Sequence, residues 1–412
     1  MRIAVIGSGA REHALTWSLS DKGRNEVWAL PGNAGCVRSA PIAIDDFNGI
    51  ENFCRLHAIE LVVVGQEQAL ALGIQNFLTQ KGFCVFGPSR EASRLEASKI
   101  WAKHFMHKYS VHTAPFAIAK TVHEAELAIS QMHGDCVIKW DGLAAGKGVS
   151  VCHNAQEAQT AFSELLGRFS STEFVIEKRL EGHELSVFAI TNGEQYTLLP
   201  AAKDYKRAYD GDLGPNTGGM GAVSCDSLLD ETLRLKIEKR IIKPTLAGLK
   251  KEQIPYIGFL YFGLMISEGE PFLLEYNVRL GDPESSAVLP RLQSSLAELI
   301  TACLEHSLDK VELKIDPRPC VNVVLAAKGY PRIFETGLPI PHCEQLAKDL
   351  LLFQASTYQE GSRLLTNGGR ILNCAALGQT LETAATAVYS TLAHLDFKDF
   401  FYRNDIGREL FA

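Results

Sequence analysis

The sequence predicts a multidomain protein that combines α/β and α+β architecture. Its 412 residues exceed one domain, since domains usually run to roughly 100–200 residues. The first hundred or so residues alternate short apolar runs with helical segments, whereas the pattern later changes to β-rich runs joined by Gly-rich loops. Apolar residues make up 46% and charged residues 22%, so the chain can bury a sizeable core and is not a disordered protein.

Residues 1–98 are expected to form a parallel α/β domain. Short buried strands that alternate with helices are typical of a parallel sheet covered on both faces. The expected strands are 3–6, 27–30, 61–65 and 84–87, and the expected helices are 11–20, 46–57 and 68–81.

Residues 99–316 are expected to form a second domain, with a smaller subdomain at about 116–188. The expected helices are 98 to about 115, 122–132, 154–167, 230–250 and 292–306, and the expected strands are 136–140, 149–152, 174–178, 257–267 and 271–279. The Gly-rich segment 203–221 lacks periodicity and is expected to form no regular element; long loops of this kind are usually functional. A linker at 316–320 leads to a compact α+β domain at 317–412.

Charge, hydropathy and cysteine spacing exclude several classes of protein. A net charge of −7 gives no signal for nucleic acid. The most apolar window, 256–267, is shorter than the ~20 residues that span a bilayer, so we expect no membrane partner. The ten cysteines are scattered singly, without a CxxC pair, which is typical of a reducing compartment and predicts a cytoplasmic protein.

The first motif is GSGAREHA (7–14), directly after the first expected strand. Glycines there let backbone N–H groups approach an anion at a helix N-terminus, and Arg11 adds a planar donor suited to phosphate. Glu12 occupies the third glycine position of the dinucleotide fingerprint, which disfavours NAD. The alternative is a tight turn with a solvated Arg11, and PGNAG (31–35), taken alone, is more typical of such a structural turn.

The second motif is KWDGLAAGKGV (139–149), between two expected strands. Its spacing does not match a P-loop, because only three residues separate the first glycines and Gly148 follows Lys147. We expect a mobile flap over a triphosphate, with Lys139 fixed on the strand beside it. A flexible solvated hairpin is the alternative.

Two further motifs place acidic side chains at strand ends. In FVIEKRLEGHELSV (174–187), Glu177 ends one strand and Glu184 opens the next, where backbone groups could pair with adenine and a carboxylate with ribose hydroxyls. In LLEYNVRLGDPE (273–284), Glu275 and Asn277 share one strand face and suit Mg²⁺, with Arg279 expected on the same face. An ion-paired strand edge is the alternative for the latter.

In combination these motifs resemble the phosphoribosylamine–glycine ligase (glycinamide ribonucleotide synthetase) family of the ATP-grasp superfamily. The resemblance runs essentially end to end and also rests on PGNAG, on GPNTGGMGA (214–222) and on TNGGRIL (366–372). It implies a pre-ATP-grasp N-domain, an ATP-grasp core with a lid subdomain and a small C-terminal domain. The sequence departs from the family pattern at Gln66, Trp140, Tyr205 and Cys225.

The resemblance also implies a reaction and a set of site residues. ATP would phosphorylate glycine, and the amine of 5-phosphoribosylamine would attack the glycyl phosphate, in purine biosynthesis. The implied ATP-binding residues are Lys99, Lys139, Lys147, Glu177 and Glu184, and the implied ligands of Mg²⁺ or Mn²⁺ are Glu275 and Asn277. The implied substrate-binding residues are Arg11, His13, Asn33, Glu67, Asn216, Thr217, Gly218 and Gly219, and the implied catalytic residues are Arg279, Asp282 and Lys147. We expect a monomer or weak dimer.

Three alternatives differ in their chemistry. An ATP-grasp carboxylase would share the ATP site but form carboxyphosphate, which the GPNTGGMGA loop disfavours. A dehydrogenase is disfavoured by Glu12. A noncatalytic nucleotide-binding regulator would tolerate loss of metal ligands, yet Glu275 and Asn277 are both present.

Overall fold

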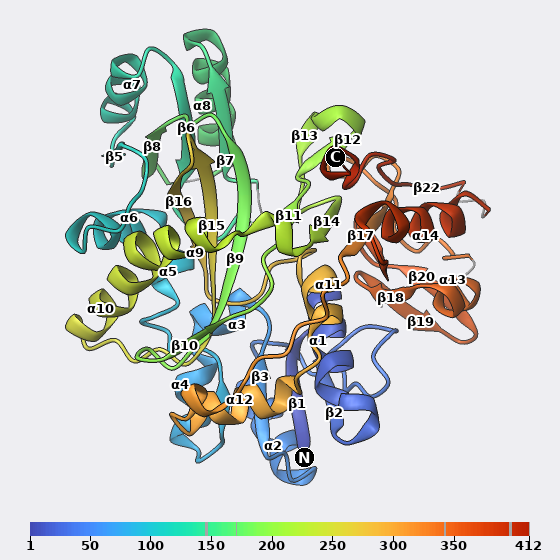
Figure 1. Ribbon diagram of the computed structural model, residues 1–412. Helices are drawn as coiled ribbons and strands as arrows, with labels where there is room; N and C mark the ends of the chain where they lie inside the picture. Colours follow the sequence, from blue (N-terminus) through green and yellow to red (C-terminus); the bar gives the residue numbers. More distant parts are fainter. Residues whose placement is uncertain (145–146, 170, 342, 395–397, 412) are drawn as a thin grey trace.

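The computed structural model describes residues 1–144, 147–169, 171–341, 343–394 and 398–411. Four sheets of four or more strands organise this part of the chain, and two small hairpins accompany them. The N-terminal segment lies at the bottom of Figure 1, the segment around α7 and α8 projects at the top, and the C-terminal segment lies at the right. The mixed α/β and α+β architecture expected from the sequence is confirmed.

The N-terminal sheet is parallel, in the order β2-β1-β3-β4. Its elements are β1 (Arg2–Gly7), α1 (Ala10–Ser20), β2 (Glu26–Pro31), α2 (Phe47–Leu56), β3 (Leu61–Val64), α3 (Glu67–Leu72), α4 (Ile74–Gln80) and β4 (Val85–Phe86). Alternate residues of β1 enter different cores: Ile3 and Val5 pack with α1, whereas Ala4 and Ile6 pack with α2 and α4. Both faces are therefore buried, which explains why the strands read as continuous apolar runs.

The helix expected at 68–81 is in fact two helices. Gly73 stands between α3 and α4 with a φ of 96°, a left-handed conformation that glycine adopts without a Cβ penalty. The break leaves Glu67 as the first residue of the short helix α3.

The upper segment is an antiparallel sheet in the order β5-β8-β6-β7, with two helices on one face. Its elements are α5 (Arg94–Ala97), α6 (Lys99–Lys108), β5 (Phe116–Ala119), α7 (Val122–Gln131), β6 (Asp135–Trp140), β7 (Val149–His153), α8 (Ala155–Arg168) and β8 (Phe174–Lys178), of which α5 and α6 precede the sheet. Helix α6 is shorter than expected, since it ends at Lys108.

The central sheet is antiparallel, in the order β10-β9-β15-β16. Its strands are β9 (His183–Thr191), β10 (Tyr196–Leu198), β15 (Gly258–Ser267) and β16 (Glu270–Asn277). Helices α9 (Glu231–Ile237) and α10 (Lys243–Lys251) pack on one face, and α12 (Leu296–Leu304) packs on the other. A π-helical turn at Glu238–Ile242 joins α9 to α10, so the expected helix 230–250 is not uniformly α-helical.

The segment 203–221 is more regular than predicted. It holds β11 (Lys203–Asp204) and a hairpin of β12 (Arg207–Tyr209) and β13 (Leu213–Asn216), followed by β14 (Gly221–Ser224). Positive φ values at Gly211, Asp212 and Gly214 form the turn. Glycine-rich composition therefore marks a tight hairpin here, and the prediction of no regular element was wrong.

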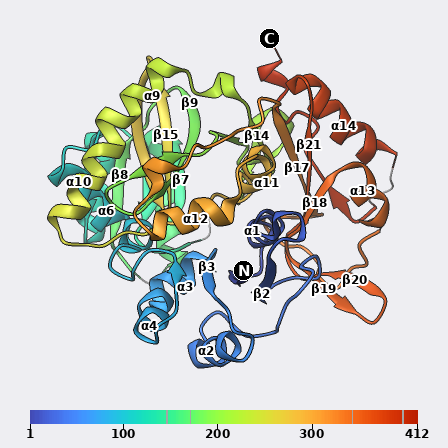
Figure 2. The same ribbon diagram turned by 60° about the horizontal axis from the view of Figure 1, so that its bottom comes forward.

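The C-terminal sheet takes two strands from the middle of the chain. Its order is β11-β14-β17-β21-β18, with β22 beside β17. The C-terminal elements are β17 (Cys320–Ala327), α13 (Cys343–Asp349), β18 (Leu351–Gln354), β19 (Thr357–Glu360), β20 (Arg363–Thr366), β21 (Arg370–Leu377), α14 (Leu381–Ala393) and β22 (Phe400–Phe401). Figure 2 shows α1 lying between the N-terminal strands and β18, while α11 (Ser285–Val288) lies near β14 and β17.

Candidate functional site

A cavity of about 390 Å³ lies where the three segments meet. Arg11 and Glu67 reach it from the N-terminal segment, and Arg370 reaches it from the C-terminal segment. Helix α6, strands β6, β7, β8, β15 and β16 and the loops between these elements supply much of the remaining wall. The cavity gathers most of the candidate residues that were predicted from the sequence.

Two buried lysines share one buried glutamate in the cavity wall, and a third, half-buried lysine lies near them. Lys103 Nζ lies 2.9 Å and Lys139 Nζ lies 3.0 Å from the same oxygen, Oε1 of Glu177. Lys139 also donates to the backbone oxygen of Leu274 at 3.0 Å, and Lys99 donates to that of Gly142 at 2.9 Å. Since one carboxylate faces several ammonium groups, the cluster keeps a positive charge toward the cavity.

In this cluster, burial and the neighbouring charges shift the pKa values of the side chains in opposite directions. Burial raises the pKa of Glu177, but Lys139 and Lys103 outweigh it and hold that pKa below the usual value. Burial lowers the pKa of Lys103 to about 8, against the opposing effect of Glu177. The side chains of Lys103 and Glu177 are 2% and 1% exposed, so little water screens their attraction.

The glycine-rich loop after β6 is tied to the start of α6. Asp141 accepts hydrogen bonds from the Ser98 hydroxyl and from the backbone N–H of Ile100 at 3.0 Å. Gly142 has a φ of 139°, and a Cβ there would lie 2.5 Å from the Trp140 ring, which stacks on Phe169. The beginning of the loop is therefore fixed to the helix that carries Lys99 and Lys103.

Lys147, unlike Lys99 and Lys139, does not line the cavity. Its backbone forms a turn with Ala144, and its side chain is exposed and outside the cavity lining. Gly146, which the sequence also placed in this flap, is outside the described residues.

Glu275 and Asn277 lie on one face of β16, and both line the cavity. A bulge at Leu274 interrupts the pairing with β15 directly before Glu275. Within the described chain, no hydrogen bond or ion pair engages either side chain. Carboxylate and amide oxygens suit Mg²⁺ or Mn²⁺, and a site with two protein ligands fits an ion that keeps water and phosphate oxygens.

Arg279 does not continue this strand face, because β16 ends at Asn277. Its guanidinium instead donates to Glu67 at 3.1 Å and to Glu96 at 2.6 Å. Arg11 approaches the same carboxylate of Glu67 at 3.1 Å. Burial raises the pKa of Glu67, but Arg279 and Arg11 together hold it well below the usual value.

The Glu12 side chain fills the helix N-terminus at the first motif. Its carboxylate accepts from the backbone N–H of Gly9 at 2.7 Å and from Arg11 Nε at 2.7 Å. A Cβ at Gly7 or Gly65 would lie 2.5 or 2.6 Å from the Glu12 side chain. The side chain thus occupies the place at the helix N-terminus where an anion would bind.

His13 and Asn33 lie at the contact between the N-terminal and C-terminal segments, outside the cavity lining. The backbone N–H of Gln354 donates to His13 Nδ1 at 2.9 Å, and Asn33 donates to the Gln354 oxygen at 2.7 Å. Asn33 also donates to Ser8 and accepts from Gly35. These contacts give both residues a structural role in joining β18 to α1, and their substrate-binding role stays a prediction.

The GPNTGGMGA loop contributes Asn216, Thr217 and Gly218 to the cavity wall. Arg370 Nη1 donates to the backbone oxygens of Gly218 and Asp282, and its Nη2 lies 3.0 Å from the Asp282 carboxylate. At Gly219 the φ is 112°, and a Cβ would lie 2.2 Å from Pro283. Arg370 therefore holds two predicted site segments together.

Several cavity residues were missed in the sequence. Lys103 follows Lys99 by four residues on α6, so helical spacing could have revealed it. Arg370 lies inside the TNGGRIL motif, which marked the segment without assigning the residue. Asp204 and Lys206 lie in the segment 203–221 and Glu284 ends the motif 273–284, but neither pattern assigned these residues to the site. Glu96 gave no signal, because only folding brings it to the cavity.

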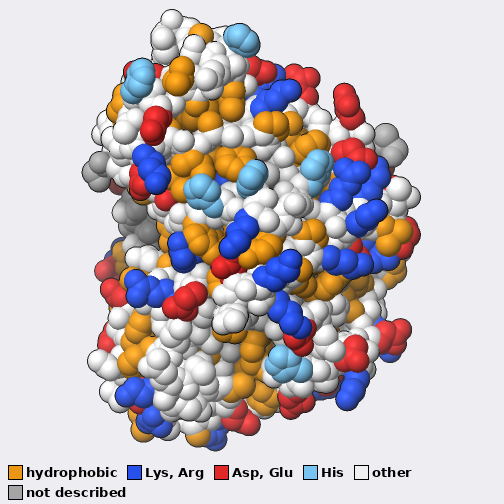
Figure 3. Space-filling model, turned by 90° about the vertical axis from the view of Figure 1, so that its left-hand side faces the viewer, with side chains coloured by type: hydrophobic (Ala, Val, Ile, Leu, Met, Phe, Trp, Pro, Cys, Tyr) orange, Lys and Arg blue, Asp and Glu red, His pale blue; other side chains and the backbone are white. Residues whose placement is uncertain are grey.

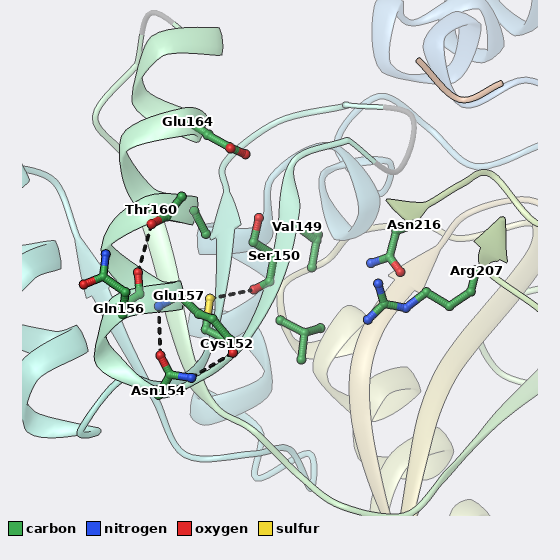
Figure 4. A pocket seen from close by; sticks show the side chains of 12 residues that line it. Val149, Ser150, Cys152, Asn154, Gln156, Glu157, Thr160, Glu164, Arg207 and Asn216 are labelled. Carbon is green, nitrogen blue, oxygen red and sulfur yellow. Dashed lines mark hydrogen bonds between the residues drawn. The ribbon is translucent and has the colours of Figure 1, made fainter. Parts of the chain in front are cut away.

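Lys206 pairs with Glu184, the residue that was predicted to contact ribose. Burial raises the pKa of Glu184, and Lys206 lowers it below the usual value in net effect. A second pocket of about 680 Å³ is lined by neither Lys206 nor Glu184. It lies between β7 and α8 on one side and the β12–β13 hairpin on the other. Figure 4 shows Arg207 and Asn216 facing Val149 across it.

On the face shown in Figure 3, basic side chains gather across the middle, and apolar and acidic side chains lie around them. Among the helices that the structure describes, none is long and apolar enough to cross a membrane.

Comparisons with known proteins cover the whole chain. Models of the phosphoribosylglycinamide synthetase N domain, ATP-grasp (A) domain and C domain match residues 1–96, 97–285 and 320–409. A phosphoribosylamine–glycine ligase of Allochromatium vinosum is 40% identical, and the match covers 100% of this chain and 99% of that protein. A bifunctional purine biosynthetic protein of Pichia angusta is also 40% identical, over 100% of this chain and 54% of that protein.

A comparison with solved structures gives the same family. A crystal structure of phosphoribosylamine–glycine ligase from Thermotoga maritima superposes with a TM-score of 0.83 at 36% identity, covering 98% of this chain and 100% of that chain. A biotin carboxylase domain from Hydrogenobacter thermophilus, at 15% identity and a TM-score of 0.68, shares the fold alone. The chain therefore belongs to the phosphoribosylglycinamide synthetase (phosphoribosylamine–glycine ligase) family.

Proposed function

We propose that this chain is an ADP-forming ligase that joins glycine to 5-phosphoribosylamine and produces glycinamide ribonucleotide and phosphate. In the first step, a glycine carboxylate oxygen attacks the γ-phosphorus of ATP, and ADP leaves. In the second step, the amine attacks the carbonyl carbon of glycyl phosphate, phosphate leaves, and the amine loses a proton.

The observation that carries the proposal is the cavity itself, in which cationic groups from three segments face Glu275 and Asn277. The main barrier to the first step is electrostatic repulsion, because the negatively charged glycine carboxylate must approach the negatively charged triphosphate of ATP. Fixed positive charge in a site with little water lowers this obstacle without any rearrangement during the reaction. Lys99 and Lys139 would contact ATP, with Glu177 orienting Lys139.

Glu275 and Asn277 would hold Mg²⁺ or Mn²⁺, which supplies charge neutralisation at phosphate oxygens when bound. Arg279 and Asp282 would line the transfer site. Arg11, Glu67 and the 216–219 segment would face the substrates, and Lys147 would reach ATP only if the loop that carries it moves toward the cavity.

The test is a coupled assay of ADP formation with ATP, glycine and freshly made phosphoribosylamine. We expect ADP formation to require both glycine and phosphoribosylamine. ADP formation that depends on bicarbonate and ignores glycine would favour carboxylase chemistry and contradict the proposal.

A further inference from the structure

Two cysteines stand directly opposite each other in the sheet of β5, β8, β6 and β7. Cys136 of β6 and Cys152 of β7 are register partners in an antiparallel pair. Directly opposed residues point to the same face of a sheet, and both side chains here lie in the apolar core beneath α7 and α8. Among the described strand pairs, no other two cysteines are opposed in this way.

The pair takes no part in the ligase reaction proposed above. Side chains alternate along a strand, so Val137 and Lys139 of β6 face the cavity, whereas Cys136 faces the helices. Neither Cys136 nor Cys152 lines the cavity, and their side chains are 0% and 1% exposed. Any role of these two thiols therefore has to come from their own chemistry.

The arrangement of the two residues fits a disulfide bond. Directly opposed residues of antiparallel strands have Cα atoms about 4.5–5.5 Å apart. This separation lies within the range of about 4.4–6.8 Å that a disulfide spans. The Cys136 thiol also donates a hydrogen bond to Cys152, so the two sulfur atoms are already neighbours in the folded chain.

The two thiols differ in acidity and in access. The hydrogen bond between them lowers the pKa of Cys152, against burial and the nearby Glu157, and raises the pKa of Cys136. Cys152 lines the second pocket, beside α8, and Cys136 does not. Figure 4 shows the Cys152 sulfur at this pocket, 4.0 Å from the Ser150 oxygen. A small oxidant that enters the pocket therefore meets the more acidic thiol first.

We propose that Cys136 and Cys152 are a redox modification site, at which hydrogen peroxide produces a reversible disulfide between β6 and β7. The Cys152 thiolate attacks one peroxide oxygen, the O–O bond breaks, and water leaves after taking up a proton, which gives a sulfenic acid. The Cys136 sulfur then attacks the sulfenic sulfur, its proton passes to the leaving oxygen, and a second water departs. Two thiols are oxidised and one peroxide is reduced to two waters, and a dithiol reductant reverses the change.

The bond would act on the edge of the sheet. Strand β7 is the outer strand of the order β5-β8-β6-β7, and it follows the glycine-rich loop after β6. A covalent bond from Cys152 to Cys136 closes a ring that contains this loop, and it restricts the separation of β7 from β6. Oxidation should therefore protect the backbone of β7 from local opening.

The first experiment uses the unchanged protein. The folded chain is treated with hydrogen peroxide, free thiols are blocked with iodoacetamide, and the peptides are identified by mass spectrometry. We expect a linked peptide that joins Cys136 to Cys152, lighter by two hydrogen atoms, which disappears after dithiothreitol. Cys84 is exposed and reports in the same sample that the oxidant has reacted with the protein. Hydrogen exchange across Val149–His153 should be slower by about tenfold or more in the oxidised form.

Variants test which thiol reacts first. Cys136→Ser should leave Cys152 as a sulfenic acid that dimedone captures, because no second thiol lies opposite it. Cys152→Ser should leave Cys136 unmodified under the same treatment, since Cys136 does not reach the pocket. Cys54→Ser is the matched control: Cys54 is a buried cysteine of α2, and its loss should leave the yield of the linked peptide unchanged.

Three results would overturn the proposal. The first is an oxidised Cys84 without any peptide that links Cys136 to Cys152. The second is a linked peptide that forms only after unfolding in urea, because the register of the folded sheet would then not be its cause. The third is equal exchange of β7 in the reduced and oxidised forms. None of these measurements depends on ligase activity, so the redox site and the proposed function stand or fall separately.

Discussion

At the scale of single residues, the cavity is organised by cations that each serve more than one acceptor. Arg11 contacts Glu12, Glu67 and the Leu280 oxygen, and Arg279 bridges Glu67 and Glu96. These guanidinium groups are held in fixed positions before any ligand arrives. Glu275, by contrast, has no hydrogen bond or ion pair to a described residue, and a free carboxylate in this position suits a metal ligand.

Because Glu275 contacts no described residue, we expect its substitution to lower activity without lowering stability. Glu275→Gln should lower turnover by at least about 100-fold, because one anionic metal ligand is lost. The Tm should stay within about 2 °C, since the substitution breaks no contact between described residues. Glu270→Gln on the same strand is the control, because Glu270 pairs with Lys236 and Arg240 outside the cavity. Near-normal turnover of Glu275→Gln at saturating Mg²⁺ would remove Glu275 from the metal site.

At the scale of elements, the hairpin of β6 and β7 combines a fixed beginning with an exposed turn. Asp141 and Gly142 are bound to the start of α6, whereas Lys147 projects into solvent. A lysine on an exposed turn can contact ATP only if the hairpin moves toward the cavity. Its charge would then act mainly in a closed state from which water is excluded.

Lys147→Met should therefore reduce kcat by about tenfold or more, while KM for ATP changes less than about threefold. Hydrogen exchange across 141–149 should slow when nucleotide is bound. Lys120→Met provides the control, since Lys120 is exposed at the far edge of the same sheet and outside the cavity lining. Unchanged exchange together with normal turnover would identify the hairpin as an ordinary solvated loop.

The sequence predicted elements better than it predicted their ends and contacts. Continuous apolar runs identified β1, β3 and β15, because strands buried on both faces leave no other pattern. The break at Gly73 and the β12–β13 hairpin were missed, since glycine is compatible with either a loop or a tight turn. Motif residues mostly reached the cavity, but the structural contacts of His13 and Asn33 depend on β18, more than 300 residues away in the chain.

At the scale of the whole molecule, the contact of α1 with β18 joins the N-terminal segment to the C-terminal segment. His13 lies in this contact, with Phe353 at 5.8 Å between ring centroids. Burial lowers the pKa of His13 from 6.5 to about 4. The folded protein therefore keeps His13 neutral at pH values where the unfolded chain binds a proton.

The difference between the pKa values of His13 in the folded and unfolded states sets the direction in which stability changes with pH. Between pH 6.5 and 4 the unfolded state binds more protons at His13, so stability falls as the pH falls. Lowering the pH from 7 to 5 should therefore reduce the free energy of unfolding by about 2 kcal/mol through His13 alone. His13→Gln removes the titration, and urea unfolding at both pH values should show a smaller loss for the variant. An equal loss in both proteins would mean that other groups control acid stability.

The strands β11 and β14 have a consequence for dividing this protein into fragments. Both come from the middle of the chain but belong to the C-terminal sheet, in which β14 pairs with β17 over four residues. A gene truncated before residue 317 would encode a polypeptide whose β14 edge is open to strand exchange with other copies. We expect that product to self-associate when expressed alone and to remain soluble when residues 317–412 are supplied as a separate polypeptide. The pairing of β14 with β17 thus makes this chain a candidate for a split reporter, whose two halves assemble by completing one shared sheet.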